Sequence, residues 1–118
     1  MEPVDFIRRL TTECRDAAVA DCVALFEQPL GRRPSEALVQ LSEWFRKLPA
    51  GDRDFVVRAM KNSADATLFG VLCVIDGVRV IESTASKTDF TLSATRDGVV
   101  SVISPGEEFL HDIYRSEA

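Results

Sequence analysis

The chain has 118 residues, of which 46% are hydrophobic and 28% are charged, and its formal net charge is −5. This apolar content is too high for a disordered chain, and the length suits one folded unit, so we expect a single domain over residues 1–118. Non-specific nucleic-acid binding depends on a cationic surface, so the acidic balance argues against nucleic acid as a partner.

The negative charge is concentrated in the second half of the chain. Residues 1–66 contain ten Lys/Arg against eleven Asp/Glu, a balance of −1, whereas residues 67–118 contain four against eight, a balance of −4. Acidic surfaces increase solubility and can steer a basic partner toward them. The charge pattern therefore points to the C-terminal half as the place where a basic protein would bind.

The sequence predicts a cytoplasmic protein with no membrane span. Acids stand near the N-terminus, at Glu2 and Asp5, where a signal peptide has basic residues. The longest uncharged apolar run, residues 66–75, would rise only about 15 Å as a helix, roughly half of a bilayer core. The three cysteines, Cys14, Cys22 and Cys73, form no C-x-x-C pair, and we expect them to be buried, reduced thiols.

Residues 3–28 are expected to form the first helix. Pro3 suits its first position, and apolar residues then recur at three- and four-residue steps as far as Phe26. The β-branched pair Thr11-Thr12 lies within this pattern and marks a possible break.

A second helix is predicted from Glu36 to Leu48, with Ser35 as its N-cap. Trp44 and Phe45 lie in its apolar stripe, which favours packing in the core over an exposed aromatic anchor for a partner. Asp52 is a candidate N-cap for the helix that follows.

The segment from Arg53 to Asp76 allows two interpretations. An unbroken apolar stripe favours one long helix, whose last ten residues would be buried on all sides. Alternatively, Asp76-Gly77 is the turn of a hairpin, and Val78 to Glu82 is its returning strand. We favour the helix.

The C-terminal part is predicted to be a hairpin and a short helix. Residues 90–95 alternate apolar and polar, Arg96-Asp97-Gly98 forms the turn, and residues 99–104 return. The closing helix is expected over Glu107 to Ser116, with its apolar residues facing the core: Phe109, Leu110, Ile113 and Tyr114. The fold class is therefore α+β: three main N-terminal helices, a small antiparallel sheet and a short C-terminal helix.

No catalytic or cofactor motif emerges, so we expect neither an enzyme nor a bound cofactor. The six glycines form no dinucleotide-binding or phosphate-binding loop. The single histidine, His111, follows Glu107 and Glu108 at helical spacing, but a metal site there would need further ligands from elsewhere in the chain.

The leading hypothesis is a non-enzymatic protein-binding module. In size, charge and class the chain is similar to acidic immunity and inhibitor proteins, which bind a toxin and block it. The acids proposed to contact the partner are Asp89, Asp97, Glu107, Glu108 and Asp112. Two alternatives stay open: a self-associating structural or accessory protein that pairs helix faces or the hairpin edge, and a metal-dependent enzyme centred on His111.

Overall fold

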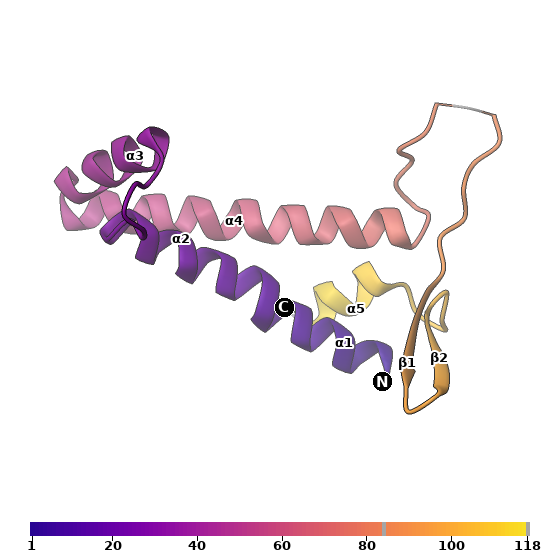
Figure 1. The fold of residues 1–118 in the computed structure, drawn as a ribbon. Helices are drawn as coiled ribbons and strands as arrows, with labels where there is room; N and C mark the ends of the chain where they lie inside the picture. The colour runs from indigo at the N-terminus through magenta and orange to yellow at the C-terminus, as the bar shows by residue number, and fades with distance from the viewer. Residues whose placement is uncertain (84, 118) are drawn as a thin grey trace.

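A computed structural model describes residues 1–83 and 85–117, and its fold is α+β as expected (Figure 1). A helical N-terminal part precedes a two-stranded antiparallel sheet and a short last helix. The elements are α1 (Pro3–Leu10), the π-helical segment η1 (Thr11–Asp16), α2 (Ala17–Glu27), α3 (Glu36–Lys47), α4 (Ala50–Ile75), β1 (Leu92–Arg96), β2 (Val99–Ser104) and α5 (Leu110–Glu117).

The predicted first helix is confirmed as one continuous rod made of α1, η1 and α2. Pro3 starts the rod, where its missing N–H leaves no bond unmade. The possible break at Thr11-Thr12 is instead the start of the wider π-helical segment, and the Thr11 hydroxyl donates to the Ile7 carbonyl at 2.9 Å. A β-branched pair thus widens the helix without ending it.

Helix α3 is capped as predicted, because the Ser35 hydroxyl accepts the Leu38 N–H at 3.2 Å. It rests on the end of α2, where Phe45 meets Phe26 edge to face at 5.7 Å between ring centroids. The core prediction holds for Phe45, which is 2% exposed, but is wrong for Trp44, which is 50% exposed. The reason is that α3 has only one helical neighbour along most of its length, so part of its apolar stripe faces outward (Figure 1).

The long-helix interpretation is confirmed, since α4 runs unbroken to Ile75 and Gly77 follows it with φ of +77°. The backbone N–H groups of Val78 and Arg79 close the helix by donating to the Cys73 carbonyl. The expectation that Asp52 caps α4 is wrong, because the helix already begins at Ala50 after Pro49. Residues 78–82 are likewise not a strand.

The hairpin has the predicted turn, in which Asp97 and Gly98 both adopt positive φ, and β2 has the predicted bounds. Strand β1 begins two residues later than expected. Helix α5 begins at Leu110 instead of Glu107, because the Asp76 carboxylate caps it there by accepting the N–H groups of Leu110 and His111.

The core lies at one end of the molecule, where α1, α4, β2 and α5 meet. Its buried members are Ile7, Leu72, Ile103, Leu110, Ile113 and Tyr114. Phe109, expected in this core, is exposed because it precedes the first turn of α5.

Three further burial predictions are wrong. Cys14 and Cys22 are exposed, whereas Cys73 is buried as expected. The end of α4 is not covered on all sides, because Val71 is 50% exposed. All three exposed side chains lie on helices that too few neighbours cover.

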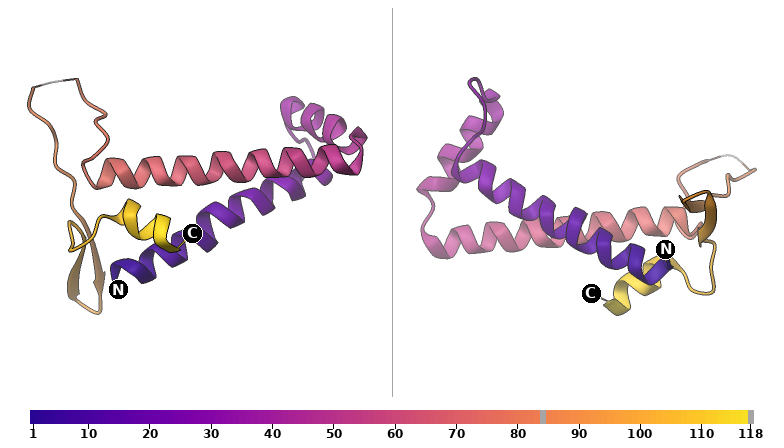
Figure 2. Two further views of the ribbon diagram at one scale, coloured as in Figure 1. Left: turned by 180° about the vertical axis from the view of Figure 1, so that it is seen from behind. Right: turned by 60° about the horizontal axis from the view of Figure 1, so that its bottom comes forward.

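The molecule is open and elongated, as two further views show (Figure 2). The rod α1–η1–α2 runs beneath α4 and diverges from it, α3 covers one end, and the hairpin stands at the other. The radius of gyration is 18.3 Å, whereas a compact chain of this length has about 13.5 Å. Among the residues that the structure describes, the helices lack an apolar stretch of the length that a membrane span requires.

Candidate functional site

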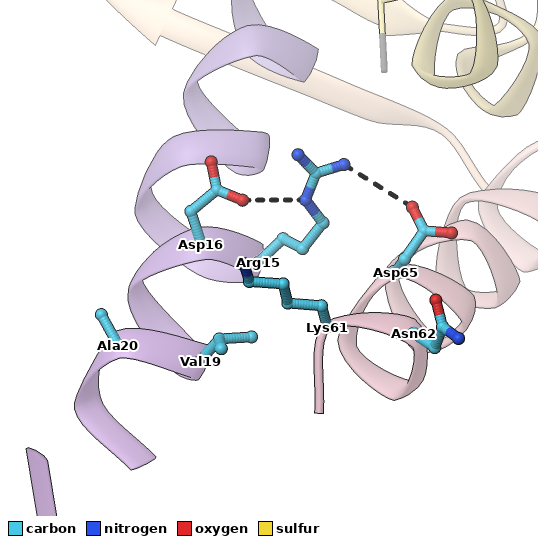
Figure 3. A pocket seen from close by; sticks show the side chains of 7 residues that line it. All are labelled: Arg15, Asp16, Val19, Ala20, Lys61, Asn62 and Asp65. Atoms are coloured by element: carbon cyan, nitrogen blue, oxygen red, sulfur yellow. Dashed lines mark hydrogen bonds and ion pairs between the residues drawn. The ribbon is translucent and has the colours of Figure 1, made fainter. Parts of the chain in front are cut away.

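A cleft of about 570 Å³, lined by charged and apolar side chains, lies between the N-terminal rod and α4 (Figure 3). A volume of this size is within the range of small-ligand sites. Val19 and Ala20 line one end and the charged residues the other. Its lining comprises Arg15, Asp16, Val19, Ala20, Lys61, Asn62 and Asp65.

Arg15 bridges the two sides of this cleft. Its Nε donates to Asp16 Oδ1 at 2.9 Å, and its Nη1 lies 3.6 Å from Asp65 Oδ1 across the cleft (Figure 3). The same Nη1 donates to the hydroxyl of Tyr114 at 3.1 Å. The guanidinium therefore ties the rod to both α4 and α5.

Asp65 is the acceptor at the centre of this network. It accepts the Tyr114 hydroxyl at 2.5 Å and Arg115 Nη1 at 3.1 Å. The hydrogen bond from Tyr114, with the bond and charge of Arg115, lowers the pKa of Asp65. Burial, followed by the hydrogen bond to Asp65, raises the pKa of Tyr114. The cluster thus favours an ionised Asp65 beside a neutral Tyr114.

The π-helical segment positions this network, because Arg15 and Asp16 are its last two residues. A π-helical turn holds one more residue than an α-helical turn and is found often at functional sites. Its wider turn changes the direction in which the following side chains leave the helix, and Arg15 is then directed toward α4 (Figure 3).

A second, apolar groove of about 370 Å³ follows a neighbouring face of α4. Cys14 and Ala18 contribute from the rod, one helical turn apart. The α4 side combines small residues with two larger apolar ones. Those residues are Ser63, Ala64, Thr67, Leu68 and Val71, and Arg15 also lines the groove.

His111 has a buried carboxylate as its partner, and sequence reasoning missed this pair. Its Nδ1 lies 2.6 Å from Asp76 Oδ2, and the Asp76 side chain is 1% exposed. The rings of Phe69 and Phe109 flank the imidazole. Glu107 and Glu108, the carboxylates that helical spacing suggested, precede α5 and are not the partners.

A metal centre at His111 lacks ligands in the part of the chain that the structure describes. There, no three His, Cys, Asp or Glu side chains gather closely enough to hold an ion. The second nitrogen, Nε2, lies 3.4 Å from Asp112 Oδ1, which adds one exposed carboxylate only. The pair instead joins the end of α4 to the start of α5.

The five acids proposed from sequence are all exposed and are spread over four segments. Asp89 lies before β1, Asp97 in the hairpin turn, Glu107 and Glu108 before α5, and Asp112 within α5. Among the described residues, Asp112 alone of the five makes an ion pair, the one to His111. The other four leave their carboxylates open to solvent.

No protein-family model, curated protein or solved structure matches this chain. The functional argument therefore rests on the cleft, the groove, the surface and the charge distribution.

Proposed function

We propose that the protein acts by binding another protein and not by catalysis, and that the partner covers apolar surface that this fold leaves open. The observation that carries the proposal is the area in contact with solvent. The chain exposes 8445 Å², about 2,000 Å² more than the roughly 6,400 Å² of a compact monomer of this mass.

Several large apolar side chains are exposed on the two ends of the molecule. On the helical end they are Leu41, Trp44 and Phe55, and on the hairpin they are Val99, Val100 and Val102. Scattered exposed apolar residues are ordinary, but groups of them on neighbouring elements are typical of interaction surfaces.

The acidic end adds a second argument for a protein partner. Asp97 and Glu107 lie at the two ends of β2 without any ion pair in the described part of the chain, beside the exposed valines of that strand. Exposed apolar side chains near free carboxylates suit a partner that presents apolar residues beside Lys or Arg, because the charges accelerate the encounter.

The test is affinity purification from the native host, comparing the wild-type protein with a variant that carries Asp97→Asn, Glu107→Gln and Glu108→Gln. We expect the wild type to retain one defined protein. Salt should weaken this binding, and the triple variant should lose it. The matched control is Glu43→Gln, a neutralised acid on α3, which should retain the partner. Identical recovery on all three proteins, or only chaperones at low and physiological salt, would contradict the proposal.

A further inference from the structure

Building on the proposed function, we infer that one partner is a second copy of this chain, packed antiparallel along the apolar groove between the rod and α4. Cys14, Ala18, Ala64, Leu68 and Val71 line the contact. The acidic surface stays outside this contact and remains free for a different protein.

The face of α4 that lines the groove has the composition of a buried surface. The segment 66–75 carries no charged residue, yet Val71 is 50% exposed. The Thr67 hydroxyl donates to the Ser63 carbonyl at 2.8 Å, so it has a partner within its own helix and can leave water at little cost. A largely apolar helix face on which the Thr67 hydroxyl is already bonded suits a helix–helix contact.

The same face is complementary to itself. Its small residues, Ser63 and Ala64, come first along α4, and its larger residues, Leu68 and Val71, come one to two turns later. A two-fold axis near Thr67 would set Val71 of each copy against Ala64 of the other. Such mutual contacts, in which residue i meets j and j meets i, are what a two-fold homodimer requires.

The exposed surface area and the charge distribution both agree with a second copy of the chain as the partner. Each chain's surplus exposed surface of about 2,000 Å² exceeds the roughly 800 Å² that one partner contributes to an ordinary stable interface, so it is large enough for a second copy. Antiparallel packing also sends the hairpin and α5 of the two copies in opposite directions, because both elements lie at one end of α4 (Figure 1). The acidic halves, each with a balance of −4, are thereby kept apart.

The first experiment measures mass by size-exclusion chromatography with light scattering. We expect the wild type at twice the chain mass of 13.1 kDa, and a monomer for Val71→Asp. The matched control is Ala66→Asp, which puts the same charge on an exposed position of the same helix outside the groove and should remain a dimer. Circular dichroism establishes that both variants are folded.

The second experiment uses the cysteines and needs no substitution. Cys14 lines the groove, whereas Cys22, also exposed, lies two turns further along the rod and outside it. Between about 1 and about 100 µM protein, alkylation of Cys14 by iodoacetamide should slow roughly tenfold, as expected for a micromolar dimer. Alkylation of Cys22 should not change.

A wild-type monomer at both concentrations, with Cys14 and Cys22 equally reactive, overturns this inference. A dimer that Val71→Asp leaves intact overturns it as well. Neither result bears on the acidic surface, because binding of its partner is measured separately with the triple charge variant. The homodimer and the binding of a different protein can therefore be disproved independently.

Discussion

Asp65 contacts three side chains, the hydroxyl of Tyr114 and the guanidinium groups of Arg15 and Arg115. Because its pKa is lowered in the folded state, it adds stability above its unfolded-state value of about 4, and this contribution is lost as the pH falls through the folded-state pKa. Asp65→Asn should therefore lower the free energy of unfolding at neutral pH by about 1–3 kcal/mol and flatten its dependence on acid pH.

Urea unfolding at a series of pH values measures this effect. Asp16→Asn is the matched control, since Asp16 bonds the same Arg15 but is more exposed and does not receive the Tyr114 hydroxyl. Equal acid sensitivity of wild type and Asp65→Asn would show that the network does not stabilise the fold.

For single residues, the sequence predicts contacts between near neighbours in the chain. It does not predict contacts between residues that are far apart in the chain and meet only in the fold. The Ser35 cap, Pro3 at a helix start and Gly77 at a helix end each depend on a few consecutive residues. The partner of His111 is Asp76, 35 positions away, and no spacing rule reaches that far. Glu107 and Glu108 matched the helical spacing, but α5 begins after them because Asp76 caps it at Leu110.

Among the elements, the hairpin turn gives a clear prediction. Gly98 has φ of +79°, and a Cβ there would meet nothing within 4 Å, so Gly98→Ala should cost about 1 kcal/mol through backbone strain alone. Gly51→Ala is the contrasting control. Gly51 also has free space, but it lies in the first turn of α4 without a positive φ, so alanine should stabilise by roughly 0.5–1 kcal/mol.

Thermal unfolding of the two glycine variants beside the wild type checks this pair. Melting temperatures that shift in the same direction would contradict it.

The elements themselves were largely predictable, because helix and strand periodicities are properties of short windows. Short stretches of sequence do not reveal which neighbouring element covers each face of a helix or strand. Cys14 and Cys22 lie on the predicted apolar stripe, but both are exposed, and the buried residue of α2 is Val19. Trp44 on α3 is likewise exposed.

For the whole molecule, the shape itself can be measured in solution. Small-angle scattering on Val71→Asp, with its mass checked by light scattering, should give a radius of gyration for the monomer near the 18.3 Å of the backbone. A value near 13.5 Å, expected for a compact chain, would show that the open arrangement collapses without a partner.

Helix α5 also sets the order in which the chain can complete its fold. Residues 110–117 supply three of the six buried core residues, and their contacts reach back to Arg8 and Arg15 in the rod. During synthesis, Ile7 and Leu72 therefore emerge long before the side chains that cover them. The core at this end of the molecule cannot be complete until residue 114 has left the ribosome. Stalling or proteolysis before residue 110 therefore yields a fragment that lacks at least three of the six buried core residues.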